Sequence, residues 1–82
     1  MIKTFIVDDE PELVELNKVL LTKHFDEIEI IGSSGSVTEA VDFINEHKPQ
    51  LLLLDIRLTD GTGFTILQKI KPYNYALIFI TA

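Results

Sequence analysis

Three carboxylates in this chain stand directly after two short apolar segments. Asp8 and Asp9 follow the apolar residues that end at Val7, and Asp55 follows a run of four leucines. If these segments form neighbouring parallel strands, their ends lie about 4.8 Å apart at one edge of the sheet. Two charges about 5 Å apart repel by on the order of 3 kcal/mol at an effective dielectric constant of about 20, so the group needs a cation or a raised pKa. Oxygen ligands without nearby histidine or cysteine suit Mg²⁺, and the sequence therefore predicts a magnesium site at Asp8, Asp9 and Asp55.

The acidic residues after the first apolar segment also have a simpler, structural interpretation. Asp8, Asp9 and Glu10 could be solvated residues that end a strand and place negative charge at the start of a helix. Asp55, at the end of a second apolar segment, favours the metal site instead. Thr81 also has both a structural and a functional interpretation. The structural one is that threonine is simply a common strand residue. A strand next to that of Asp55 would, however, bring the Thr81 hydroxyl within reach of a phosphoryl oxygen, and we expect that contact.

The histidines and glycines favour structural roles. His24 and His47 fall near predicted helix ends, where a positive charge suits the helix dipole, and no second ligand is spaced to form a metal site with either. Gly61 and Gly63 follow Asp55 without the full glycine-rich pattern of a phosphate cradle. We therefore predict turn residues at both glycines.

Seven elements must position these side chains. Apolar residues of β-branched and aromatic type predict strands, and apolar residues at helical spacing predict helices. The strands are expected at residues 2–7, 28–32, 51–55 and 76–80, and the helices at residues 11–25, 37–48 and 64–70. Strands that alternate with helices indicate parallel βαβ units with helices on both faces of one sheet. The second strand is partly polar, as an edge strand is, so right-handed crossovers favour the strand order 2-1-3-4.

The predicted second helix has signals at both of its ends. Ser36 and Glu39 have the spacing of a capping box, in which the serine hydroxyl and the glutamate carboxylate each bind a free backbone N–H. Lys48 precedes Pro49, and a proline disfavours helical geometry in the residue before it. The helix is therefore expected to begin after Ser36 and to end at Lys48.

Composition narrows the class of protein. A chain of 82 residues allows one domain, and no boundary is evident within residues 1–82. The absence of cysteine excludes disulfides, thiolate zinc sites and cysteine nucleophiles. Thirteen acidic and seven basic residues give a net charge of −6, which would repel nucleic acid and anionic membranes. No apolar run approaches the roughly 20 residues that span a bilayer, so we expect a cytoplasmic protein.

Four motifs together resemble those of the receiver domains of two-component response regulators, and the resemblance covers the whole chain. The motifs are Ile6-Val7-Asp8-Asp9-Glu10-Pro11, Glu39-Ala40, Leu53-Leu54-Asp55-Ile56-Arg57-Leu58 with Gly63 eight residues past the aspartate, and Ile80-Thr81-Ala82. The resemblance implies a flavodoxin-like α/β fold. It also implies a phosphoacceptor switch in two-component signal transduction, rather than an enzyme.

The resemblance further implies roles for the residues of the predicted magnesium site. A histidine kinase would phosphorylate Asp55, and Mg²⁺ would be held by Asp9, Asp55 and the backbone carbonyl of Arg57, with Asp8 helping through water. The chemistry agrees with this, because a carboxylate can form an acyl phosphate and Mg²⁺ can neutralise charge on the transferred group.

The resemblance implies a switch at the end of the fourth strand. Thr81 would move toward the phosphoryl group, and the small side chain of Ala82 would leave room for it. The added negative charge could thereby be transmitted to the fourth-strand edge. The spacing in Asp60-Gly61-Thr62-Gly63-Phe64 is similar to that of receivers joined to LytTR-type DNA-binding domains. We therefore expect a DNA-binding output domain, and a role in transcription regulation, in the full-length protein.

Two departures from the family pattern bear on the expected fold. Thr59 stands where the family usually has proline, which affects only the local shape of the loop. The family's fifth strand, the lysine that follows it and the fourth and fifth helices have no counterpart in residues 1–82. We therefore expect an incomplete receiver domain that accepts phosphate poorly, and its open fourth-strand edge makes self-association possible.

Rival functions remain open from the sequence. An aspartyl-phosphate hydrolase of haloacid dehalogenase type has a similar motif around Asp55, but it needs a second carboxylate where Arg57 stands, and arginine is a poor general acid. A flavin-binding domain would need a hydroxyl and glycine loop after the first strand. A plain protein-interaction module is the third alternative, and it would carry no phosphate on Asp55.

Overall fold

The central sheet has four parallel strands in the order β2-β1-β3-β6. The computed structural model describes residues 1–80. The long strands are β1 (Ile2–Val7), β2 (Ile28–Ser34), β3 (Leu51–Asp55) and β6 (Ala76–Ile80). Because β6 is the fourth long strand along the chain, the predicted order 2-1-3-4 is confirmed.

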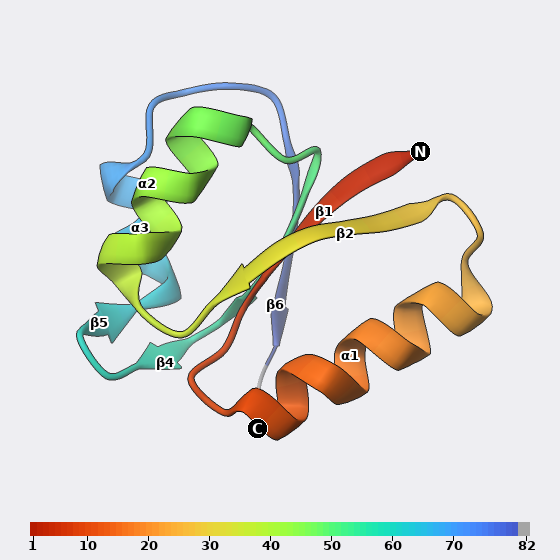
Figure 1. Cartoon of the computed structure of the whole chain (residues 1–82). Coiled ribbons are helices and arrows are strands. Elements are labelled where there is room, and N and C mark those ends of the chain that lie inside the picture. Colours follow the sequence, from red (N-terminus) through yellow and green to blue (C-terminus); the bar gives the residue numbers. More distant parts are fainter. Residues whose placement is uncertain (81–82) are drawn as a thin grey trace.

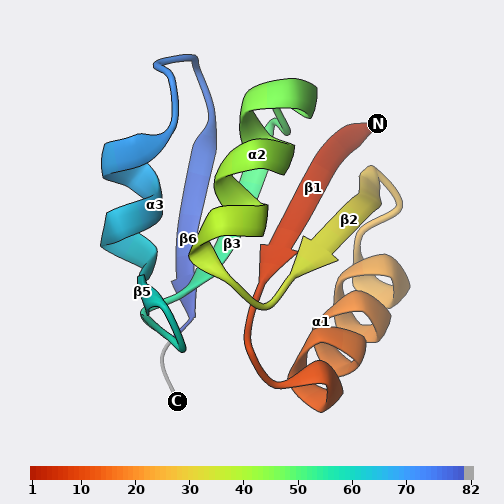
Figure 2. The same ribbon diagram turned by 60° about the vertical axis from the view of Figure 1, so that its left-hand side comes forward.

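Three helices cover the two faces of this sheet (Figures 1 and 2). They are α1 (Pro11–His24), α2 (Val37–His47) and α3 (Gly63–Lys69). Figure 2 shows α1 on one side of the strands and α2 with α3 on the other. Helices on both faces of a parallel sheet are the expected result of right-handed crossovers, and the predicted α/β class is confirmed. No helix within residues 1–80 is long and apolar enough to cross a membrane.

The register between β1 and β3 explains the uninterrupted leucine run. Phe5 pairs with Leu52 and Ile6 pairs with Leu53, so side chains at equal height point to the same face. Phe5 and Leu52 pack in the core under α2 and α3, whereas Ile6 and Leu53 pack with Val14 of α1. Both faces of these strands are therefore buried, and neither face needs the polar residues that an edge or half-exposed strand would carry.

Strand β2 is longer than its apolar residues predict. It continues past Gly32 to Ser34, because Ser33 and Ser34 pair with Ile6 and Val7 of β1. A shift in register between Thr4 and Phe5 precedes these pairs. Pairing of strands uses backbone groups, so the two serines can extend the strand without an apolar side chain.

Two short strands that the sequence did not predict lie between β3 and α3. They are β4 (Arg57–Leu58) and β5 (Gly61–Thr62), and they form a small antiparallel hairpin. Helix α3 begins directly after it, with a capping box between Thr62 and Thr65. The predicted turn residue Gly63 is therefore the first residue of a helix, which corrects that prediction. Gly61 does lie in the hairpin, with a φ angle of 156°.

The predicted capping box at α2 is only half formed. The Ser36 hydroxyl accepts from the Glu39 backbone N–H at 3.2 Å, as expected. The Glu39 carboxylate instead lies 3.3 Å from the Ser36 hydroxyl, and the Ser36 N–H donates to the Ser34 hydroxyl. Ser34 thus takes the place that the motif assigns to the glutamate.

Candidate metal centre

The carboxylates of Asp8, Asp9 and Asp55 converge at the carboxyl ends of β1 and β3. Each offers one oxygen, and these oxygens all lie within 4.8 Å of one another. The strand register explains the convergence, because Val7 pairs with Leu54 and the next residue of each strand is an aspartate. The structure therefore brings together the three carboxylates that the sequence singles out. Within residues 1–80, no other group of three or more histidine and acidic side chains is close enough to hold a metal ion.

The three carboxylates differ in exposure and in their hydrogen bonds. Asp8 is 3% exposed, Asp55 is partly buried and Asp9 is exposed. The Glu10 N–H donates to Asp8 Oδ1 at 2.9 Å, and the Arg57 N–H donates to Asp55 Oδ1 at 3.3 Å. These two bonds fix the orientation of the carboxylates, and each leaves lone pairs for a further ligand.

The pKa of the Asp8 carboxyl is raised above its ordinary value. Burial is the largest cause, and the negative charges of Asp55 and Asp9 and a hydrogen bond with Asp55 act in the same direction. The hydrogen bond from the Glu10 N–H acts against them and lowers the pKa. A cation among these oxygens would relieve the repulsion, so the electrostatics of the group favour binding of a hard divalent ion.

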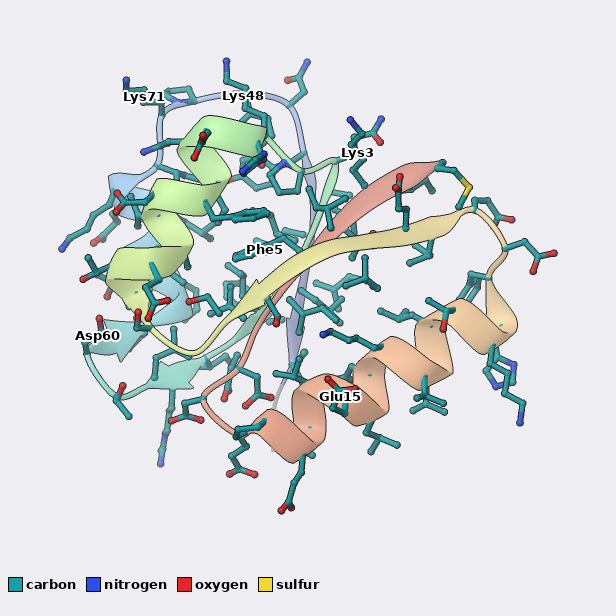
Figure 3. The ribbon with its side chains drawn as sticks, viewed as in Figure 1. Lys3, Phe5, Glu15, Lys48, Asp60 and Lys71 are labelled. Carbon is teal, nitrogen blue, oxygen red and sulfur yellow. The ribbon has the colours of Figure 1, made fainter. Side chains whose placement is uncertain are left out.

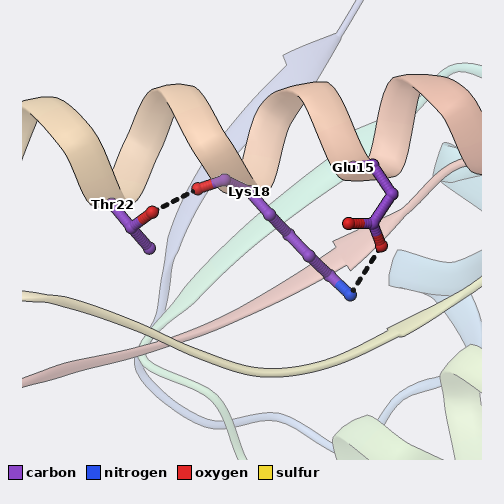
Figure 4. Close-up of polar contacts among 3 residues, drawn as sticks. All are labelled: Glu15, Lys18 and Thr22. Atoms are coloured by element: carbon purple, nitrogen blue, oxygen red, sulfur yellow. Dashed lines mark hydrogen bonds and ion pairs between the residues drawn. The ribbon is translucent and has the colours of Figure 1, made fainter.

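A cavity of about 330 Å³ opens beside the carboxylates. Asp8, Asp9 and Ser34 contribute to its wall, as do Glu15 of α1 and Glu39 in the first turn of α2. Lys18 forms an ion pair with Glu15 at 3.4 Å, and the Thr22 hydroxyl donates to the Lys18 carbonyl at 2.7 Å (Figure 4). Within residues 1–80, no lysine or arginine forms an ion pair with the three aspartates. Their charge is therefore left for a ligand to balance.

Of the remaining predicted site residues, the structure describes only Arg57. Arg57 is the first residue of β4, two positions after Asp55, and its side chain is exposed. Thr81 and Ala82 lie outside the described residues. Ile80, which precedes them, is paired with Asp55 between β6 and β3.

Gly63 contacts the site, which was not predicted from the sequence. A Cβ atom at Gly63 would lie 2.6 Å from the carbonyl oxygen of Asp55 and 3.0 Å from Phe79 Cε1. The Gly63 N–H also donates to the Ile56 carbonyl at 3.0 Å. Only glycine allows α3 to begin this close to the end of β3. The glycine itself was the available signal, but its spacing from Asp55 does not reveal which atom it approaches.

Comparison with known proteins identifies the family. Residues 4–82 match the response regulator receiver domain family. The chain belongs to this family. Receiver domains are signalling switches rather than a class of enzyme, so membership decides against the hydrolase and flavin-binding alternatives.

Similar receiver domains occur in longer regulators. The sensory transduction protein LytT of Enterococcus faecalis is 39% identical over 79 residues, which cover 94% of this chain and 32% of LytT. The transcriptional regulatory protein BtsR of Salmonella typhi is 36% identical over 83 residues, which cover 100% of this chain and 34% of BtsR. The chain thus spans about a third of the length of these relatives.

Solved receiver domains share the fold. The response regulatory domain of mrkE from Klebsiella pneumoniae superposes with a TM-score of 0.86 and 28% identity, covering 98% of this chain and 66% of that one. The MaeR response regulator bound to beryllium trifluoride gives a TM-score of 0.84 and 31% identity, covering 100% of this chain and 68% of that one. These matches agree with the flavodoxin-like sheet order described above.

Proposed function

We propose that this receiver domain acts in the cytoplasm as a phosphoacceptor, and that Asp55 takes a phosphoryl group from a histidine kinase in the presence of Mg²⁺. The observation that carries the proposal is the convergence of three carboxylate oxygens within 4.8 Å at the ends of two adjacent strands. One of these carboxylates must serve as the nucleophile. Asp55 suits this role because it is partly exposed, whereas Asp8 is almost fully buried, and because the family pattern in the sequence assigns Asp9 to the metal.

Asp9, Asp55 and the Arg57 backbone carbonyl are the proposed ligands of Mg²⁺, and Asp8 is proposed to act through a bound water. All are hard oxygen donors, which fits this ion. Bound Mg²⁺ supplies positive charge that offsets the charge of the phosphoryl oxygens. The pKa of Asp8 is raised chiefly by burial and further by the negative charges of Asp55 and Asp9, and a bound cation would offset both causes.

The proposed reaction is an in-line displacement at phosphorus. A carboxylate oxygen of Asp55 forms a bond to phosphorus while the bond from phosphorus to the donor's imidazole nitrogen breaks, which leaves an acyl phosphate. We propose that Thr81 contacts the phosphoryl group and that the small side chain of Ala82 leaves room for this contact, on the basis of the family pattern in the sequence. The pairing of Ile80 with Asp55 supports this assignment.

The proposed partners are the kinase and an output domain that binds DNA. A relative from Mycobacterium tuberculosis that is 38% identical over 66 residues is named as the DNA-binding transcriptional activator DevR/DosR. BtsR is likewise named as a transcriptional regulatory protein. The net charge of −6 argues that residues 1–82 do not contact DNA themselves.

Treatment with a small phosphodonor tests the proposal. With acetyl phosphate and Mg²⁺, we expect intact-mass spectrometry to show the addition of one acid-labile phosphoryl group. Asp55→Asn should abolish the addition, and chelation of Mg²⁺ should suppress it. Asp42→Asn is the matched control, because Asp42 is an exposed carboxylate on α2 outside the site. Phosphate on the Asp55→Asn variant would mean that another residue is the acceptor, and no phosphate on the unmodified chain would favour a plain interaction module instead.

A further inference from the structure

The hairpin that follows Asp55 is fastened to helix α2 by the side chain of Asp60. Asp60 Oδ1 accepts from the Val37 N–H at 2.7 Å. Its other oxygen, Oδ2, accepts from the Thr38 N–H at 3.3 Å and from the Thr38 hydroxyl at 3.4 Å. Figure 3 shows Asp60 beside the first turn of α2. The Asp60 side chain therefore joins the hairpin to the start of α2, where its partner Thr38 lies 22 residues away in the sequence.

These bonds are separate from the local cap of the helix. Ser36 caps α2 through the Glu39 N–H, whereas Asp60 binds the N–H groups of Val37 and Thr38. The Asp60 bonds hold its pKa below the ordinary value, chiefly through the Val37 N–H. The two side chains thus satisfy different groups of the same helix start, and only Asp60 links that start to another element.

The hairpin is also fixed at its base, next to the proposed phosphoacceptor. The Arg57 N–H donates to Asp55 Oδ1, and the Gly63 N–H donates to the Ile56 carbonyl. Between base and tip, Arg57 pairs with Thr62. At the tip, a Cβ atom on Gly61 would lie 3.0 Å from Val37 Cγ2, so the hairpin lies close against α2. Asp60 is therefore the polar contact that fixes the tip of a short segment whose base carries Asp55.

We infer that Asp60 is a positioning residue for the phosphoacceptor site: by fastening the hairpin tip to α2, it sets the orientation of the Arg57 backbone beside Asp55. This inference rests on the proposed function, in which the Arg57 carbonyl is a ligand of Mg²⁺. Asp60 does not touch the reacting atoms. Its contribution is to hold one ligand of the site in place, as residues that orient metal ligands do in other proteins.

Two variants separate this role from simple capping of the helix. Asp60→Ala removes the bonds to α2 and frees the hairpin tip, whereas Ser36→Ala removes a cap from the same helix start and leaves the hairpin fastened. Two readouts are compared in both: the Mg²⁺ affinity from titration, and the backbone amide chemical shifts of Asp55 and Arg57 measured by NMR without metal. Because a purely structural role would affect both variants alike, their difference isolates positioning.

We expect Asp60→Ala to weaken Mg²⁺ binding by about tenfold and to shift the Arg57 amide signal. Ser36→Ala should leave both readouts close to those of the unmodified chain. If circular dichroism shows that Asp60→Ala is unfolded, Asp60→Asn is measured in its place. This variant keeps part of the contact, because its amide oxygen can still accept from the Val37 N–H. We expect Asp60→Asn to have a smaller effect than tenfold, but a clearly larger one than Ser36→Ala.

Equal behaviour of the Asp60 and Ser36 variants in both readouts would overturn the inference. Failure of the proposed function has a different signature, namely an unmodified chain that takes no phosphate on Asp55. In that case the metal-free amide shifts still decide whether Asp60 orients the Arg57 backbone.

Discussion

Asp8 carries a carboxyl group in a place where its charge is poorly solvated. The side chain is 3% exposed, and burial raises its pKa above the ordinary value of 3.8. A raised pKa in the folded state means that the protonated form favours folding. The resulting stabilisation is present below the unfolded-state pKa of 3.8 and is lost as the pH rises through the folded-state value. At neutral pH, the charge on Asp8 therefore opposes folding.

Asp8→Asn should consequently stabilise the domain at neutral pH. We expect its melting temperature at pH 7 to exceed that of the unmodified chain by a few degrees, and the two values to converge at about pH 3, where Asp8 is protonated. Mg²⁺ should raise the melting temperature of the unmodified chain by more than that of the variant. Thermal melts followed by circular dichroism across this pH range measure both effects. A variant no more stable than the unmodified chain at pH 7 would contradict this account.

The sequence predicted the residues of the acidic group but not the contacts that surround it. Asp8, Asp9 and Asp55 could be found because each follows an apolar strand, and strand ends of a parallel sheet meet at one edge. The bonds of Asp60 depend on how closely the hairpin approaches α2. No local spacing encodes that approach, so only the folded arrangement reveals it.

At the scale of elements, the start of α3 is tightly packed against the end of β3. A Cβ atom on Gly63 would lie 2.6 Å from the Asp55 carbonyl oxygen, which belongs to the backbone and cannot rotate away. The strand, the helix or both must therefore shift to admit any side chain. Since Asp55 is the proposed nucleophile, this shift would also disturb the site.

Gly63→Ala should destabilise the domain by about 1–3 kcal/mol, the usual range for overpacking. It should also slow the phosphorylation of Asp55. Urea denaturation and the mass-spectrometric assay measure the two effects. Gly35→Ala is the matched control, because a Cβ atom there would meet its nearest neighbours at 3.5 Å, an ordinary contact distance. Equal stability of the two variants would show that the close approach at Gly63 is not restrictive.

Elements with a strong residue pattern were predictable, and those without one were not. The leucine run of β3 and the apolar stripe of α2 follow directly from burial. The hairpin of β4 and β5 has two residues in each strand, which is too short for any alternation to appear. The end of β2 at Ser34 was missed because backbone pairing, rather than an apolar side chain, extends that strand.

At the scale of the whole molecule, β6 is bonded to a neighbour on one side only. It pairs with β3, and no strand within residues 1–80 pairs with its other edge. Ile78, in the middle of β6, is 49% exposed. An apolar strand with an open edge offers unpaired backbone groups to another chain. For residues 1–82 alone, self-association through this edge is therefore possible.

Size-exclusion chromatography with light scattering should reveal this association. For a protein of residues 1–82 alone, we expect the mean mass to rise with concentration, and Ile78→Lys to reduce the rise because charged residues discourage pairing at strand edges. Val19→Lys is the control, since Val19 is an exposed apolar residue on α1, away from the edge. A constant monomer mass at high concentration would rule out edge association.

The pairing of Val7 with Leu54 has a consequence for which parts of the chain can vary in length. The separation of the acidic oxygens is set by hydrogen bonds between two strands, so it does not depend on the segments that lead into those strands. The connections at residues 25–27, 48–50 and 70–75 lead into β2, β3 and β6, so all of them lie at the amino-terminal ends of the strands, opposite the acids. Insertions there would lengthen the molecule without moving the acids. Deletion of a single residue inside β3 would instead change the register of this strand. Its side chains would point to the opposite face, and Asp55 would no longer lie next to Asp8.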